Sequence, residues 1–130
     1  MPNPVNIREL VPLLMVSDLK HSLTFYIDKL GFQLCQQADD KGNLIWCRIE
    51  KDGVAVMLQQ ACLDEDDMSK VGNGVTLYWI CDDVDTLQSQ FAANGLELND
   101  PTVAYYGMKQ LYLKDPDGYD LCFESPVQCD

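Results

Sequence analysis

The sequence predicts an α+β protein made of two tandem βαβββ units, and three observations lead to this fold class. The first is an internal repeat: residues 11–34 are similar to residues 75–98, with matching positions 64 residues apart at Leu23/Leu87, Gly31/Gly95 and Leu34/Leu98. The second is a pair of Asp-Gly turns, at 52–53 and 117–118, which lie 65 residues apart. The third is the same order of strand-like and helix-like patterns in both copies. A chain of two similar halves usually buries one shared core and carries its functional groups in symmetry-related pairs.

The first unit, residues 10–60, begins with an apolar run at 10–16 that predicts a strand. Ser17 or Asp18 then supplies a helix N-cap, because its side-chain oxygen can accept amide protons of the first turn. Apolar residues recur at helical spacing up to Leu30, and Gly31 ends the helix. Three more strands are predicted at 32–38, 44–50 and 54–59, with turn residues between them.

The second unit, residues 75–125, repeats this order. An apolar run at 75–81 predicts a strand, and Asp82 or Asp83 caps a helix that continues through Asn94. The remaining strands are predicted near Leu96 and at 103–106, 110–114 and 119–124, the last of them after the turn Asp115-Pro116-Asp117-Gly118. An acidic linker, residues 61–74, joins the two units within one domain, 1–130, and its carboxylates lack the spacing of a calcium loop.

Charge and cysteine content limit the partners of this chain of 130 residues. Its net charge of −12 argues against nucleic acid and anionic membrane surfaces. The same charge is compatible with a cationic ligand, or it simply keeps a cytosolic protein soluble. The sequence contains no apolar run of transmembrane length and nothing similar to a signal peptide. Its six cysteines show no CxxC pairing, so we expect a cytoplasmic protein.

Short motifs along the chain resemble those of the vicinal oxygen chelate superfamily, which contains glyoxalases, bleomycin-resistance proteins and extradiol dioxygenases. The motifs are Val16-x-Asp18-Leu19, Ser22, Phe25-Tyr26, Leu30-Gly31-Phe32 and Leu113-Lys114-Asp115-Pro116-Asp117-Gly118-Tyr119. The resemblance implies that each unit curls its mixed sheet into half of a cup, with a pocket between the sheets. It is stronger evidence for the fold than for the chemistry.

The resemblance also implies where a metal would be held, since enzymes of the superfamily bind a divalent metal through His, Gln or Glu on the first and last strands of each unit. The corresponding positions here are Val11, Val75 or Thr76, Met57 and Cys122. These side chains do not form the nitrogen and oxygen site that such a metal needs, and the one histidine, His21, lies in the first predicted helix. We therefore expect no metal and no other cofactor.

Two weaker metal hypotheses stay open at this stage. Met57 and Cys122 could hold a soft metal such as Cu(I), although such groups in an apolar cup more often only pack together. Gln59 and Glu124, two residues further along the same strands, should point to the same face and could form a displaced pair of oxygen ligands.

Among the members of the superfamily, bleomycin-resistance proteins are the nearest in style, because they also lack metal ligands and sequester a large cationic antibiotic at a dimer interface. The chain resembles them at Val11-Pro12-x-Leu14 and at residues 106–116, where Tyr106 stands at a position that is often tryptophan. The resemblance implies a homodimer without catalytic residues that binds a small organic molecule. Whether residues 1–9 stay on their own subunit or cross to the other is left open.

Strand alternation supplies candidate ligand-binding residues independently of the resemblance. In the strand at 44–50 it places Ile45, Cys47 and Ile49 in the core and leaves Trp46 and Arg48 on the cup side. The same reasoning adds Tyr112 and Glu124, and it adds Tyr78 if Leu77, Trp79 and Cys81 are core, while the opposite parity of that strand stays open. With Tyr106 from the resemblance, the candidate set is Trp46, Arg48, Tyr78, Tyr106, Tyr112 and Glu124. Aromatic rings with one carboxylate suit a flat or cationic molecule through stacking and cation–π attraction.

Two other classes of function compete with metal-independent binding. One is a metal-dependent lyase or dioxygenase of the glyoxalase type, with ligands at other positions than those considered above. The other is a ligand-sensing or partner-binding module that turns nothing over.

Elemental analysis of the purified protein distinguishes the first alternative. We expect no stoichiometric transition metal, because the four positions named above offer no imidazole or carboxylate donor. One Ni, Zn, Fe or Mn ion per chain would instead favour the lyase or dioxygenase.

Overall fold

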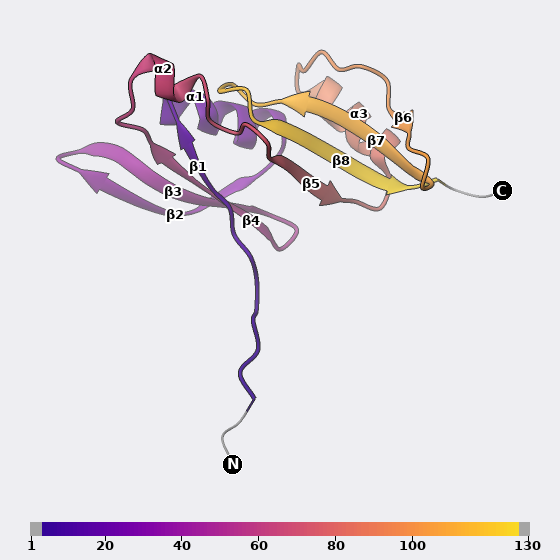
Figure 1. Cartoon of the computed structure of the whole chain (residues 1–130), viewed down its shortest axis with the longest axis horizontal. Helices are drawn as coiled ribbons and strands as arrows, with labels where there is room; N and C mark the ends of the chain where they lie inside the picture. The colour runs from indigo at the N-terminus through magenta and orange to yellow at the C-terminus, as the bar shows by residue number, and fades with distance from the viewer. Residues whose placement is uncertain (1–3, 128–130) are drawn as a thin grey trace.

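Two four-stranded mixed sheets, one from each copy of the repeat, form the protein (Figure 1). The computed structural model describes residues 4–127, so Cys129 lies outside the described residues. The strand orders are β1-β4-β3-β2 and β5-β8-β7-β6, and in each sheet the first and last strands of the unit are parallel neighbours while the other pairs are antiparallel. The predicted α+β fold of two βαβββ units is therefore confirmed.

The elements of the first unit are β1 (Leu13–Val16), α1 (Leu19–Leu23), the π-helical segment η1 (Thr24–Lys29), β2 (Gln33–Asp40), β3 (Asn43–Lys51) and β4 (Val54–Gln60). A short helix, α2 (Glu65–Met68), lies in the acidic linker. The second unit consists of β5 (Thr76–Ile80), α3 (Val84–Ala93), β6 (Thr102–Val103), β7 (Met108–Lys114) and β8 (Asp120–Pro126). None of the helices in the described residues is long and apolar enough to cross a membrane.

Local sequence signals explain most of these boundaries. Asp18 and Asp83 are extended residues whose carboxylates accept amide protons of the following helical turn, from His21 and from Asp85 and Thr86 respectively. The hairpins β2–β3 and β3–β4 turn at 41–42 and 52–53, where both residues have positive φ, as in a turn that matches the twist of the strands.

Several predicted boundaries are wrong, each for a physical reason. β1 starts at Leu13, not residue 10, and residues 4–10 are exposed, ahead of Pro12, which lacks an amide proton. The first helix widens into η1, where the Leu30 amide donates to the Phe25 carbonyl five residues back. The segment near Leu96 forms no strand, because the Leu96 amide donates to the Phe91 carbonyl of α3 and the leucines pack against the core.

The prediction of a strand at 103–106 is also wrong beyond Val103, where β6 ends. The chain turns at 104–107 instead, with the Gly107 amide donating to the Ala104 carbonyl at 3.0 Å. Gly107 has a φ of +85°, which suits glycine at this turn. The turn brings Tyr106 back over the second sheet.

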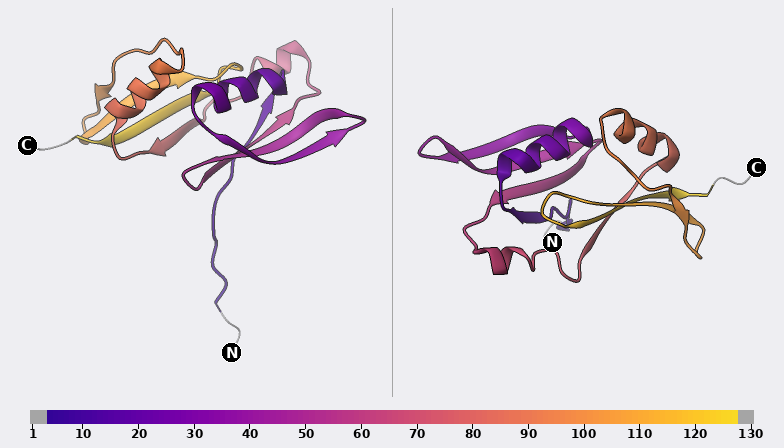
Figure 2. Two further views of the ribbon diagram at one scale, coloured as in Figure 1. Left: turned by 180° about the vertical axis from the view of Figure 1, so that it is seen from behind. Right: turned by 90° about the horizontal axis from the view of Figure 1, so that it is seen from above.

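The helix of α1 and η1 and the helix α3 cover the same side of the two sheets, and the opposite sheet faces are uncovered (Figure 2). The apolar core lies between helices and sheets and includes Tyr26, Leu30, Ile49, Leu58, Phe91 and Leu121, all nearly inaccessible. Cys47 and Ile49 are buried as predicted, but Ile45 is 39% exposed, because it lies near the hairpin end that extends beyond the helix. The sheets lie side by side and do not close, so one chain does not form the expected cup.

Buried polar contacts join the two units. Tyr26 of η1 donates its hydroxyl to Asp115 Oδ2 at 2.9 Å, while Asp115 Oδ1 accepts the amides of Asp117 and Tyr119, each at 2.9 Å. Tyr119 in turn donates its hydroxyl to the Met15 carbonyl at 2.8 Å. Burial raises the pKa of the Asp115 carboxyl, and the hydrogen bonds that it accepts oppose that shift.

Replacing Tyr26 by Phe should lower the free energy of unfolding by about 1–3 kcal/mol, because a buried carboxylate oxygen then loses its only hydroxyl donor. Urea unfolding followed by circular dichroism measures this change. Tyr105→Phe is the matched control, since that side chain is fully exposed, and its effect should stay within about 0.5 kcal/mol. Equal effects of the two substitutions would contradict the stabilising role of the bond.

Candidate functional site

Four of the six predicted ligand-binding residues lie together on the uncovered face of the second sheet. Tyr78 on β5 and Tyr112 on β7 both pair with Cys122 of β8, so the three side chains point to the same face. Glu124 lies two residues further along β8 and therefore shares this face. Tyr106 reaches the same place from the turn at 104–107.

A continuous set of hydrogen bonds connects these four side chains through Gln110. The hydroxyls of Tyr78 and Tyr112 lie 3.2 Å apart, and Tyr112 donates to Gln110 Oε1 at 3.0 Å. Gln110 Nε2 donates to Glu124 Oε2 at 2.8 Å and also to the Tyr106 hydroxyl. The Tyr106 hydroxyl donates to the same Glu124 oxygen at 3.2 Å. We call these five residues the tyrosine–glutamate network.

Sequence reasoning missed Gln110, which is the central member of this network. It pairs with Glu124 across β7 and β8 and is only 7% exposed. The signal was available, because Gln110 stands two residues before Tyr112 on the same predicted strand and must point to the same face.

Glu124 is a buried carboxylate without a cation beside it. It is 7% exposed, and no lysine or arginine in residues 4–127 forms an ion pair with it. The two lysines of the adjacent strand are paired elsewhere, Lys109 with Asp85 and Lys114 with Asp120. A buried charge is costly unless it is paired and hydrogen-bonded, and here only hydrogen bonds from neutral groups compensate it.

Tyr106 keeps its proton in this environment. Burial raises the pKa of its hydroxyl, and the hydrogen bond to Glu124 raises it further, because a tyrosinate beside a carboxylate is unfavourable. Tyr106 therefore acts as a hydrogen-bond donor to Glu124 and not as a base.

The other two predicted residues, Trp46 and Arg48, lie on β3 of the first sheet and not with the network. Arg48 Nη2 bonds both carboxylate oxygens of Glu9, at 3.1 and 3.2 Å, and Glu50 at 3.3 Å. Arg48 is therefore engaged by two carboxylates of its own chain. The six predicted residues do not form one recess within a single chain.

The strand register shows that Trp46 and Arg48 of the first unit occupy the positions of Gln110 and Tyr112 in the second unit. Trp46 pairs with Gln59 as Gln110 pairs with Glu124. One row further, Arg48 pairs with Met57 as Tyr112 pairs with Cys122. The repeat thus keeps the geometry of its uncovered faces but not their chemistry.

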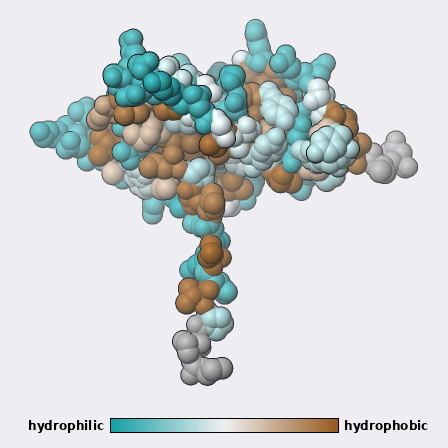
Figure 3. All heavy atoms as spheres, in the orientation of Figure 1, coloured by the Kyte–Doolittle hydropathy of each residue, from teal (hydrophilic) through white to brown (hydrophobic). Residues whose placement is uncertain are grey.

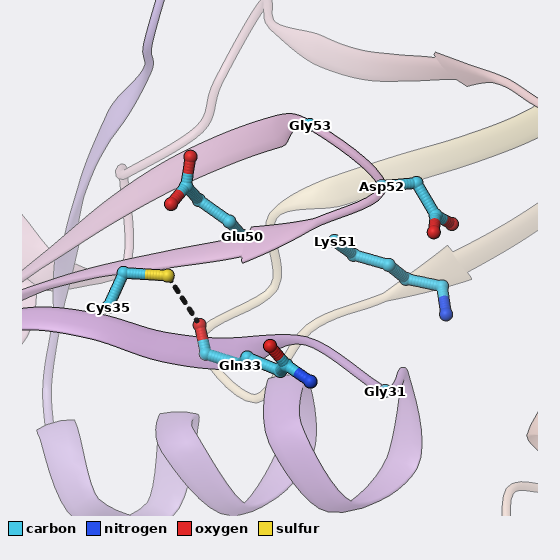
Figure 4. Close-up of a pocket in the computed structure, with 7 residues that line it drawn as sticks. All are labelled: Gly31, Gln33, Cys35, Glu50, Lys51, Asp52 and Gly53. Atoms are coloured by element: carbon cyan, nitrogen blue, oxygen red, sulfur yellow. Dashed lines mark hydrogen bonds between the residues drawn. The ribbon is translucent and has the colours of Figure 1, made fainter.

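A polar hollow of about 420 Å³ lies at the end of the first sheet, away from the network, and is lined by β2, β3 and the turn before β4 (Figure 4). Cys35 points into this region and contacts the Gln33 carbonyl at 3.6 Å. The hydrogen bond with Glu50 raises the pKa of the Cys35 thiol, which keeps it protonated. The thiol of Cys35 is therefore not an activated nucleophile, and the hollow is a less favourable candidate site than the network.

The positions that correspond to metal ligands in the superfamily do not form a metal site of the usual kind. Met57 and Cys122 occupy corresponding rows of the two sheets and pair with Leu13 and Tyr78. Nowhere in residues 4–127 do three His, Cys, Asp or Glu side chains gather in a way that could hold a metal ion. His21 is exposed on α1.

Residues 4–12 form an arm that extends away from the uncovered side of the sheets (Figure 1). Its apolar side chains are almost fully exposed, with values of 94% for Val5, 97% for Ile7 and 87% for Leu10. Figure 3 shows hydrophobic atoms along this arm and over the centre of the molecule where the arm leaves it. Exposed apolar surface is typical of interaction sites when it is contiguous.

Comparison with known families finds one match that covers most of the chain. The model of the Glyoxalase/Bleomycin resistance protein/Dioxygenase superfamily matches residues 7–123. A search of curated proteins finds no match.

Many solved structures share the fold at low sequence identity. An antibiotic binding protein, TnmS3 from Streptomyces sp. CB03234, is 21% identical with a TM-score of 0.71, over 95% of this chain and 100% of that one. TioX from Micromonospora sp. ML1 is 16% identical with a TM-score of 0.68, over 95% and 99%. A glyoxalase-related enzyme from Clostridium phytofermentans is 14% identical with a TM-score of 0.73, over 97% and 100%. At these identities the likeness establishes the fold alone.

The cysteines of the core should react slowly with alkylating reagents. Burial raises the pKa of the Cys47 and Cys122 thiols to about 11 each, so very little thiolate exists near pH 8. Pulsed iodoacetamide labelling with peptide mass spectrometry should modify the exposed Cys62 first and leave the other two unmodified until urea unfolds the protein. Labelling of Cys122 as fast as Cys62 would show that the network face opens more than its burial indicates.

Proposed function

Because the chain belongs to the Glyoxalase/Bleomycin resistance protein/Dioxygenase superfamily, we propose that it is a metal-independent binding protein that sequesters a small cationic or aromatic compound of the antibiotic kind. The observation that carries this proposal is the buried carboxylate of Glu124, which accepts hydrogen bonds from Tyr106 and Gln110 and has no cation beside it among the described residues. Tyr112 and Tyr78 continue the same network. A ligand with a positive charge and a flat ring would pair its charge with the Glu124 carboxylate and stack its ring on the tyrosines.

The similar structures support this proposal in a limited way. TnmS3 is named as an antibiotic binding protein, and the family model includes bleomycin-resistance proteins. A glyoxalase-related enzyme is equally similar in fold, so the fold itself does not separate binding from catalysis. The choice of binding over catalysis rests on the side chains of the tyrosine–glutamate network.

The working form is a homodimer in this proposal. Both sheets leave one face uncovered on the same side of the molecule, and the arm of residues 4–12 extends from that side with its apolar residues exposed. A second copy placed on these faces would bury the arm and could bring Trp46 and Arg48 of one chain opposite the network of the other. The six predicted residues would then line one recess at the interface, one recess for each chain.

The proposed location is the cytoplasm. All five cysteines in the described part of the chain are free thiols, although two of them, Cys35 and Cys62, are exposed. Free exposed thiols persist in a reducing compartment. The strongly negative net charge makes nucleic acid and anionic membranes poor partners.

Thermal unfolding in the presence of ligands tests the binding proposal. Bleomycin-type and other cationic aromatic compounds at millimolar concentration should raise the melting temperature, because a ligand that binds only the folded state stabilises it by mass action. Glu124→Gln should reduce this shift, while Glu97→Gln, a control at an exposed carboxylate outside the network, should leave it unchanged. If none of these compounds stabilises the protein, the binding proposal fails.

Sedimentation equilibrium tests the dimer separately. The full chain should sediment as a dimer at micromolar concentration, and removal of residues 1–10 should weaken the association by about tenfold or more, because it removes three exposed apolar side chains and Glu9. A matched control, Lys41→Ser in the exposed β2–β3 turn, should not change the dissociation constant. A monomer at all concentrations would refute the dimer but not the binding of a ligand.

A further inference from the structure

The donors and acceptors of the tyrosine–glutamate network can be assigned completely. The amide oxygen of Gln110 can only accept, so the bond from Tyr112 uses the single hydroxyl proton of that tyrosine. The 3.2 Å bond between the two hydroxyls must then use the proton of Tyr78. Every proton in this part of the network therefore points from Tyr78 toward Gln110.

The other half of the network is equally constrained. Gln110 Nε2 has two protons and uses one for Glu124 and one for the Tyr106 hydroxyl. Tyr106 accepts from Gln110 and gives its own proton to Glu124. The opposite orientation of the amide would place its oxygen against the oxygen of Glu124, so Glu124 determines which way Gln110 points.

Within one chain this inventory leaves acceptors for a ligand and no donors. Arg48, which the proposed dimer would bring opposite the network, is held by Glu9 and Glu50 of its own chain. Glu124 Oε2 receives two hydrogen bonds, but Glu124 Oε1 has no partner among residues 4–127. The Tyr78 hydroxyl donates its proton to Tyr112, and its lone pairs stay free to accept a hydrogen bond. The Tyr78 side chain is 49% exposed, so a ligand can reach this oxygen. All protons of Gln110, Tyr106 and Tyr112 are used within the network.

We infer that this face is an acceptor-only site, which selects a ligand with N–H donors on a positively charged group and has Gln110 as its specificity-determining residue. The inference rests on the proposed small-molecule function and deepens it, because it separates N–H donation from charge alone. A primary ammonium or a guanidinium group can donate to Glu124 Oε1, and the Tyr78 oxygen offers a further acceptor to a ligand N–H. A quaternary ammonium has the same charge but no N–H, and an anionic ligand brings only further acceptors.

Three probes of nearly equal ring surface separate these possibilities. They are 1-naphthylmethylammonium, its N,N,N-trimethyl analogue and 1-naphthoate, titrated into the full-length protein and followed by calorimetry or NMR. The ammonium should bind about tenfold or more tightly than the trimethyl analogue, because the latter displaces water from Glu124 Oε1 and the Tyr78 oxygen without donating to either. The carboxylate should bind most weakly.

Variants assign this selectivity to the network. Gln110→Met keeps the size of the side chain but releases the Tyr112 proton, so the Tyr112–Tyr78 hydroxyl pair gains a free donor on this face and the ratio of the two affinities should fall to about threefold or less. Tyr78→Phe removes one free acceptor from a half-exposed position and should lower the ratio without risk to folding. Tyr105→Phe removes a fully exposed neighbouring hydroxyl and should leave the ratio unchanged.

Each outcome of these titrations bears on a different claim: the role of Gln110, the acceptor-only site or small-molecule binding itself. A loss of affinity that is equal for both cations in Gln110→Met would mean a structural role for Gln110 and would overturn its assignment as the specificity-determining residue. If the trimethyl analogue binds the wild-type protein as tightly as the ammonium, the acceptor-only site is refuted, although small-molecule binding stands. If none of the three probes binds at millimolar concentration, the proposed function fails together with this inference.

Discussion

The buried carboxylate of Asp115 is the contact on which the arrangement of the two units depends. Within its own turn it accepts two amide protons, and from the other unit it accepts the hydroxyl proton of Tyr26. Burial raises the pKa of this carboxyl, so the three hydrogen bonds are what make its charged form tolerable in the core. Because Tyr119 of the same turn also bonds to β1, the second unit is held beside the first and not folded over it.

This side-by-side placement decides where function can lie. Both helices cover one side of the molecule, so the two uncovered sheet faces lie on the other side, together with the arm. The duplicated register gives these faces matching positions, and the side chains at those positions have diverged. One face carries Arg48 held between two carboxylates, and the other carries Glu124 with no cation beside it in the described part of the chain. Arg48 corresponds to Tyr112 and Glu124 to Gln59, so the two faces offer different side chains at corresponding places.

Much of the fold could be predicted from local patterns in the sequence. Helix N-caps at Asp18 and Asp83 and the glycine turns at 42 and 53 act over a few residues, so their effect can be seen without the rest of the chain. Predictions failed where local signals are weak, as at residues 96–106, where leucine packing and a tight turn replace the expected strands. Strand parity predicted the outward side of Tyr112, left that of Tyr78 open and did not indicate that the amide of Gln110 connects them.

The sequence by itself determined the two repeated units, the order of their elements and the faces on which the candidate residues lie. These properties depend on periodicity and turn chemistry, which act between near neighbours. Only the tertiary structure decided which residues meet. Tyr26 and Asp115 are 89 residues apart, and Glu9 reaches Arg48 across 39 residues. Such contacts follow from how whole units pack, which no local pattern encodes. For the same reason, Trp46 and Arg48 came to lie apart from the other four candidates.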